Sequence, residues 1–192
     1  MEGNGSNLEL MARNRLNNWV AVSVAILSAF MAVTKVKDDN IVQAMLQAKS
    51  DAVDSWGEYQ AKRIKQHLAE LGLKQTEALY VTAREGGKRV LAEQQRDYRA
   101  GIDRYLVEEE ELKKKAQGFE KEYDKLNFRD DQFDLSDAAL SVSLALLAVT
   151  ALTGKRKLFA FSWIFAGFGV VMGLAGLIGL SLHPDWLTRL LS

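Results

Sequence analysis

Six aspartates flank the charged middle of the chain and form its densest set of side chains that could do chemistry. They are Asp38, Asp39, Asp130, Asp131, Asp134 and Asp137. Clustered carboxylate oxygens are the ligands that calcium and similar hard cations take in proteins. Lys35, Lys37 and Arg129 stand beside them, so helix capping and an exposed ring of charge are the simpler interpretation. A cation site would require the two acidic groups to meet.

Other chemistry has little support among the residue types. The chain has no cysteine, and its two histidines, His67 and His183, lack evident catalytic partners. None of the sequence motifs for phosphate loops, dinucleotide binding, zinc peptidases or serine hydrolases is present. The 25 basic and 25 acidic side chains also disfavour a nucleic-acid binder. We therefore expect a protein that is not an enzyme, with no cofactor, no nucleic-acid partner and no identified small-molecule substrate.

Three stretches without formal charge must position the acidic groups. They cover residues 16–34, 138–154 and 158–184, which are 19, 17 and 27 residues long. An apolar helix needs about 17–25 residues to cross the hydrocarbon of a bilayer. Between the first two stretches, residues 38–136 carry 38 charges in 99 positions. The pattern predicts an all-α chain with three transmembrane helices and one large extramembrane segment.

The predicted boundaries follow from these composition changes. They are a tail at 1–15, transmembrane helix 1 at 16–36, an extramembrane helical hairpin at 37–136, transmembrane helix 2 at 137–154, a basic loop at 155–157, transmembrane helix 3 at 158–183 and an interfacial C-terminal helix at 184–192. The three-residue loop makes the last two spans a tight antiparallel pair. Pro184 suits the first turn of the short terminal helix.

Sidedness is predicted from the basic residues, because lysine and arginine in short segments resist translocation. Arg13 and Arg15 before the first span, and Lys155, Arg156 and Lys157 in the short loop, favour the cytoplasmic side. We expect a multi-pass protein of the bacterial inner membrane with an external, periplasmic hairpin. A cleaved signal peptide is the alternative for the N-terminus, and large residues at the end of the first apolar stretch favour an uncleaved anchor.

The charged middle segment lacks proline and is rich in good helix formers, which predicts helices. In its second half, apolar residues recur in steps of three and four, with Gln95 and Glu109 filling two gaps. They are Leu91, Tyr98, Ile102, Tyr105, Leu112, Ala116, Phe119, Tyr123 and Leu126. From 91 to 126 there are 35 residues in ten steps, a period of 3.5. This heptad period predicts left-handed packing against another helix.

The first half carries a looser apolar series, and the chain must return to the membrane surface that it left. The looser series is Ile41, Met45, Ala48, Ala52, Trp56, Tyr59, Ile64, Leu68 and Leu71. A return requires an even number of helical legs, and the pair Gly86 and Gly87 lies at the midpoint, where glycine permits a helix reversal. We predict a coiled-coil-like antiparallel hairpin with its turn near 86–87 and legs of roughly 70 Å.

Each span also carries small residues at helical spacing, which allow close approach of helices in lipid. They are Ala21, Ala25, Ser28 and Ala32 in the first span, Ala138, Ser141, Ala145 and Ala148 in the second, and Ala166, Gly169, Gly173 and Gly176 in the third. These faces predict a compact bundle. The spacing alone leaves open whether they pack within one protomer or between protomers.

Several stretches resemble a bacterial membrane-protein family known as domain of unknown function 4337. They are Val36–Ala44 after the first span, Trp56–Ala61, the acidic stretch Arg129–Asp137 and, for some members, Leu182–Trp186. The resemblance covers nearly the whole chain, and the acidic stretch is its most specific part. It implies the one-plus-two arrangement of spans and brings no activity, cofactor or catalytic residue.

Two functional hypotheses follow. The first is a non-enzymatic membrane scaffold or accessory subunit that forms a homo-oligomer, or joins a larger membrane complex, through the hairpin and the small-residue faces of the spans. The second is an oligomeric ion or solute pathway in which the acidic residues form a vestibule at the base of the hairpin. Apolar surface left exposed by the hairpin would favour the first.

Overall fold

A computed structural model describes the backbone of residues 2–180 and the side chains of residues 11–180. In this part of the chain there are three helices and no strand, so the predicted all-α class is confirmed. The helices are α1 (Glu2–Thr82), α2 (Glu85–Thr153) and α3 (Arg156–Ile178). The interfacial helix predicted at 184–192 lies outside the described residues.

Helix α1 is continuous, although the sequence analysis divides the same residues into a tail, a span and the first leg of the hairpin. Its 81 residues contain no proline, and its glycines at 57 and 72 do not break it. The tail predicted at 1–15 is therefore the beginning of the helix, because nothing in the polar N-terminal stretch forces the backbone out of the helical conformation.

The reversal between α1 and α2 lies at Ala83 and Arg84, three residues before the glycine pair. The prediction that Gly86 and Gly87 form the turn is wrong. The Arg84 carbonyl accepts bonds from the backbone N–H groups of Gly87 (2.9 Å) and Lys88 (3.0 Å), which places both glycines in the first turn of α2. Neither glycine has a positive φ, so the reversal does not use their special freedom.

The connection between α2 and α3 does use glycine. Gly154 has a φ of 66° and its N–H donates to the Thr150 carbonyl, which ends α2. Lys155 then leads directly into α3. At the other end of α3, Gly179 adopts the left-handed conformation (φ 71°) and its N–H bonds to the Ala175 carbonyl. L-residues with a Cβ rarely adopt this conformation, so these two positions favour glycine.

The chain divides into two compact units. The first, called the anchor unit below, combines Met1–Ala44 with Lys125–Ser192, and the second, called the helix-pair unit, is Met45–Asp124. In the anchor unit, parts of α1 and α2 pack with α3 around a core of buried apolar side chains. The core residues are Val20, Leu27, Leu140, Leu147 and Ala166.

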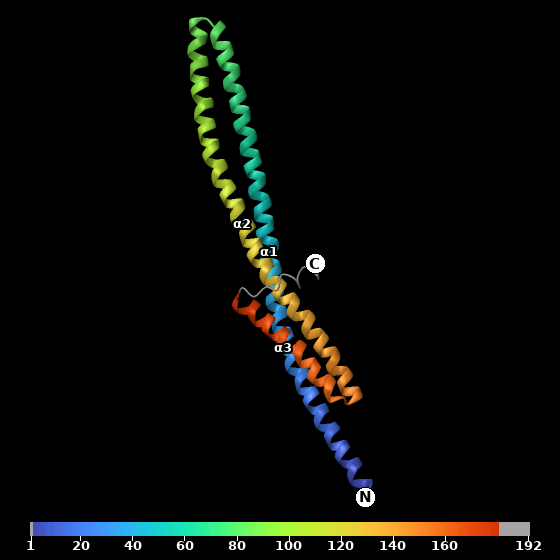
Figure 1. Ribbon diagram of the computed structural model, residues 1–192. Coiled ribbons are helices and arrows are strands. Elements are labelled where there is room, and N and C mark those ends of the chain that lie inside the picture. Colours follow the sequence, from blue (N-terminus) through green and yellow to red (C-terminus); the bar gives the residue numbers. More distant parts are fainter. Residues whose placement is uncertain (1, 181–192) are drawn as a thin grey trace. The chain divides into compact units, whose positions relative to one another are not determined.

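In the helix-pair unit, the second part of α1 packs beside the first part of α2 (Figure 1). Trp56 bonds to Glu120, Lys62 pairs with Glu108, and Glu77 pairs with Arg99. The partner numbers fall along α2 as they rise along α1, so the two segments run antiparallel.

By length and composition, each of the three helices could cross a membrane. The apolar windows have mean hydropathies of 1.9, 1.9 and 2.0 for α1, α2 and α3. This agrees with the three apolar stretches identified in the sequence.

Candidate functional site

Glycines of α3 form the tightest contact in the anchor unit. A Cβ placed on Gly169 would lie 2.8 Å from Cγ of Leu140 and 3.0 Å from the Ser136 carbonyl oxygen. A Cβ on Gly173 would meet the Ser136 hydroxyl and the Phe30 ring, and one on Gly176 would meet the Phe133 ring. The small-residue face of α3 is therefore filled by α1 and α2 of the same chain.

The small-residue faces predicted for the first two spans lie elsewhere. Ala21, Ala25, Ser28 and Ala32 on α1 and Ala138, Ser141, Ala145 and Ala148 on α2 are all exposed. The inner positions of α2 are instead Leu140, Ser143, Leu147 and Thr150. Only the α3 set packs within this chain, because larger side chains from α1 and α2 fill the space that its glycines leave.

Polar side chains on one face of α2 bind backbone carbonyls of α3 and of Leu180, which follows it. Ser136 donates to the Gly169 carbonyl (2.8 Å) and Ser143 to the Ser162 carbonyl (2.9 Å). Gln132 donates to the Leu180 carbonyl (2.7 Å), and Arg129 donates to that of Gly176 (2.8 Å). The cation and the amide thus satisfy carbonyls at the C-terminal end of α3, where a helix attracts positive charge.

Sequence reasoning missed this bonding face. The sequence pattern does not single out Ser143 and places Arg129 only beside the acidic residues. The available signal was the spacing, because residues 129, 136 and 143 are seven apart and so share a helix face. The polar side chains of the anchor unit therefore include groups that hold α2 to α3 by hydrogen bonds, in addition to the carboxylates.

Of the six predicted acidic residues, Asp38 is the most enclosed. It is 4 % exposed, its Oδ2 accepts a bond from Lys35 (2.7 Å), and its Oδ1 has no donor. The carboxyl of Asp130 reaches Asp38 within hydrogen-bond distance, and Asp134 is close enough to interact electrostatically with both. Asp39 and Asp134 are exposed, whereas Asp131 and Asp137 are half-buried.

Two neighbouring carboxyl groups of this kind favour holding a proton. Burial, the bond to Asp38 and the nearby charges of Asp134 and Asp131 raise the pKa of Asp130 to about 7. If Asp130 is protonated, its carboxyl O–H can donate a hydrogen bond to the carboxylate of Asp38, which two ionised carboxylates could not form. Among the described residues, no three acidic or histidine side chains form a group that could hold a metal ion. The structure thus brings Asp38 and Asp130 together without gathering the six carboxylates into a cation cage.

The heptad positions predicted in the second half of the middle segment all lie on the buried or half-buried face of α2. They are Leu91, Tyr98, Ile102, Tyr105, Leu112, Ala116, Phe119, Tyr123 and Leu126, with Gln95 and Glu109 between them. Ala116 is fully enclosed. The period of 3.5 thus marks the inner face of this helix.

The corresponding series on α1 departs from the prediction after Tyr59. Ile64, Leu68 and Leu71 are exposed, and the inner face continues through Lys62, Ala69, Gly72 and Thr76. The buried positions from Ile41 to Thr76 keep the heptad period, 35 residues in ten steps, which the partner helix requires. The large apolar residues beyond Tyr59, which are Ile64, Leu68 and Leu71, lie instead on an exposed face of α1.

Gly72 has a specific packing role on this inner face. A Cβ at this position would lie 2.6 Å from Cζ of Tyr98, so the glycine leaves the space that the Tyr98 ring occupies. The sequence alone suggests only that Gly72 weakens the helix. Gly57 and Gly118, by contrast, have open space where a Cβ would stand.

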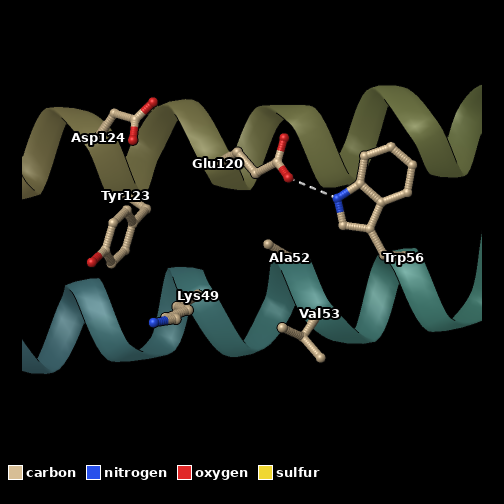
Figure 2. Close-up of a pocket in the computed structure, with 7 residues that line it drawn as sticks. All are labelled: Lys49, Ala52, Val53, Trp56, Glu120, Tyr123 and Asp124. Atoms are coloured by element: carbon tan, nitrogen blue, oxygen red, sulfur yellow. Dashed lines mark hydrogen bonds between the residues drawn. The ribbon is translucent and has the colours of Figure 1, made fainter.

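A shallow pocket of about 270 Å³ lies between the two helices of the helix-pair unit, as Figure 2 shows. Trp56 donates from Nε1 to Glu120 (2.8 Å), and the Lys49 ammonium lies 5.8 Å from the Tyr123 ring centroid. Ala52, Val53 and Asp124 complete its lining. These polar groups largely satisfy one another, so the pocket is best explained as packing between helices.

Together, the fold and these contacts define an all-helical protein with three helices able to span a membrane and with no assembled catalytic group among its described residues. The family model for "Domain of unknown function (DUF4337)" matches residues 16–179, and the chain belongs to that family. No curated protein and no solved structure matches the chain.

Proposed function

We propose that this protein is a non-enzymatic membrane scaffold or accessory subunit, with the three apolar stretches of the anchor unit in the bilayer and the charged residues 37–136 outside it. The observation that carries the proposal is the reversed polarity of the anchor unit. Along its three apolar stretches the large exposed side chains are apolar, while several hydroxyl groups are buried inside. The exposed set includes Trp19, Ile26, Val33, Val149, Leu152, Phe161, Ile164 and Val171.

This polarity suits lipid better than water. Ser136, Ser143, Thr150 and Ser162 are each at most 1 % exposed, and their hydroxyls bond to carbonyl groups. In lipid such internal bonds replace those that water would supply, and small residues allow the helices to approach. In water the same unit would expose a large apolar surface at considerable cost.

The proposed orientation places the N-terminus and the basic residues 155–157 in the cytoplasm of a bacterial cell, with the helix-pair unit in the periplasm. These three consecutive basic residues, which are the N-cap and the first two residues of α3, support it. Because the chain has no cysteine, single-cysteine variants can be labelled in intact cells with a membrane-impermeant maleimide. Gly118→Cys should react in intact cells, and Lys157→Cys should react only after permeabilisation. The reverse pattern would contradict this orientation.

The scaffold function is tested by native mass measurement of the protein in lipid nanodiscs extracted without detergent. The expected result is a complex of defined stoichiometry, containing either several copies of the chain or the chain with a second membrane protein. A species that is monomeric under all conditions and carries no second protein would contradict the proposal.

An oligomeric ion or solute pathway is the second candidate, favoured by the enclosed carboxyls of Asp38 and Asp130. Its test is ion flux into liposomes containing the purified protein. Replacing Asp130, Asp131 and Asp134 with asparagine should reduce cation flux if these groups collect cations. Unchanged flux would remove the acidic vestibule from consideration.

A further inference from the structure

The helix-pair unit leaves one face of α1 apolar and exposed. Large side chains on this face are separated by three or four residues or by sums of such steps, so they form a line along the helix. They are Leu46, Val53, Ile64, Leu68, Leu71 and Leu79, all more than half exposed. We call this line the outer stripe. Ser50, Gly57, Gln60 and Gln75 fill its gaps, so no charged residue interrupts it.

The outer stripe lies opposite the face of α1 that contacts α2. Ala48, Ala52, Ser55, Ala69 and Thr76 are buried on that inner face, about half a turn away from the stripe. The outer face of α2 has a different character, because it is dominated by charged residues. Its exposed valine at 107 has no line of apolar neighbours. Only α1 therefore offers a continuous apolar surface to a second helix.

The charged residues that border the outer stripe differ between its two edges. Lys49, Arg63 and Lys74 each stand immediately before a stripe position and so lie on one edge, which is mainly basic and also holds Glu70. Asp51, Asp54 and Glu58 each stand immediately after a stripe position and so lie on the other edge, which begins with these three acids and continues to Lys65.

These edges favour one direction of pairing between two copies. In a parallel pair, the basic edge of one helix faces the acidic edge of the other. Lys49 of one copy then lies beside Asp54 of the second copy, in the way that e and g positions pair in coiled coils. In an antiparallel pair, the basic edge would face itself. Like charges across such a contact are destabilising.

The stripe is long enough to support a stable contact. From Leu46 to Leu79 it extends about 50 Å at a rise of about 1.5 Å per residue, and a helix is about 10 Å wide. The strip covered on each copy is therefore roughly 500 Å², or about 1,000 Å² for the pair. That total is near the lower bound of specific protein interfaces.

Membrane anchoring adds a second reason for parallel pairing. Copies inserted in one membrane with the same sidedness present α1 in the same direction, a step that rests on the function proposed above. Ala21, Ala25, Ser28 and Ala32, the exposed small residues of α1 in the anchor unit, would also allow close approach of a second α1 in lipid.

We infer that the outer stripe of α1 is the interface for a second copy of this chain, which packs in parallel and in register as a homodimer. In such a pair each stripe residue lies next to the same residue of the other copy. Cα atoms across a coiled-coil seam come within the roughly 4.4–6.8 Å that a disulfide spans.

Disulfide cross-linking in cell membranes tests the inference, since the chain has no cysteine of its own. Gln60→Cys and Gln75→Cys, each made alone, should give a homodimer after mild oxidation. Val107→Cys on α2, at 61 % exposure, is the matched control and should remain monomeric. Adding Ile64→Glu and Leu68→Glu to Gln75→Cys should lower the dimer yield at least tenfold, whereas adding Val107→Glu should leave the yield unchanged.

Three results would overturn the inference. They are monomers at both stripe positions, links formed only when two different single-cysteine chains are mixed, and links from the stripe to a different protein. Maleimide labelling at positions 118 and 157 separates such a failure from failure of the membrane orientation. An unchanged labelling pattern with no stripe dimer would remove the interface and leave the proposed anchor in place.

Discussion

The contact between Gly169 of α3 and α2 allows a quantitative test of the anchor unit. In Gly169→Ala the added Cβ would lie 3.0 Å from the Ser136 carbonyl oxygen and 2.8 Å from Cγ of Leu140. Leu140 is fully buried, so it cannot move aside. Overpacking of this kind costs about 1–3 kcal/mol, and separating the helices would also weaken the bond from Ser136, worth about 0.6 kcal/mol in a bilayer. The helix preference of alanine offsets up to about 1 kcal/mol of this cost, so we expect the free energy of unfolding to fall by about 1–3 kcal/mol.

Gly167→Ala is the matched control, because it makes the same chemical change on the same helix with nothing within 4 Å of the new methyl group. Its effect should be neutral or stabilising by up to about 1 kcal/mol, as alanine favours helix. Both variants can be unfolded in mixed micelles of rising dodecyl sulfate content, followed by circular dichroism and tryptophan fluorescence. Equal unfolding midpoints for the two variants would refute the packing of α3 against α2.

Three further results are expected. The folded protein holds a proton on Asp130 up to about pH 7, whereas an unfolded aspartate loses it near pH 4. Stability should therefore fall by roughly 1–2 kcal/mol from pH 4 to pH 7 after allowance for solvent screening, and Asp130→Asn, but not the exposed Asp97→Asn, should flatten that slope in thermal unfolding. Gly72→Ala should lower stability by about 1–3 kcal/mol through its clash with a tyrosine ring, while Gly118→Ala, in open space, should raise it. Trp56→Phe removes one exposed hydrogen bond and should cost no more than about 1 kcal/mol in the same assay.

Helix α2 shows what a sequence pattern can predict. Its inner face repeats every 3.5 residues, and apolar or small residues such as Ala116 and Phe119 alternate with long charged ones. Because burial and charge vary together along this helix, the pattern identifies the face that meets α1. The three apolar stretches are equally visible, since they depend on composition alone.

Helix α1 shows where the same reasoning fails. It has two faces with few charged residues, and the larger side chains, Ile64 and Leu68, are on the face that α2 does not cover. The inner face is built there from Lys62, Ala69 and Gly72, which no hydrophobic scale would select. A second contact surface on a helix thus misleads any prediction that assumes a single one.

The glycine contacts and the carboxyl pair also lay beyond sequence reasoning. The spacing of small residues distinguishes Gly169 from Gly167, but only the structure shows that Ser136 and Leu140 are the neighbours that a methyl group at 169 would meet. Likewise, Asp38 and Asp130 are 92 positions apart, so their contact depends on how the helices assemble.

The two-residue link between α2 and α3 has a consequence for biogenesis. A connection formed by Gly154 and Lys155 is too short for one helix to enter the bilayer while the other waits in water. In the proposed membrane arrangement the two would therefore insert together, with the hydroxyl groups of Ser136 and Ser143 bonded to their carbonyl partners on α3. A longer link would allow α3 to insert independently of α2, and insertion of such a variant would show whether α3 depends on α2 to enter the membrane.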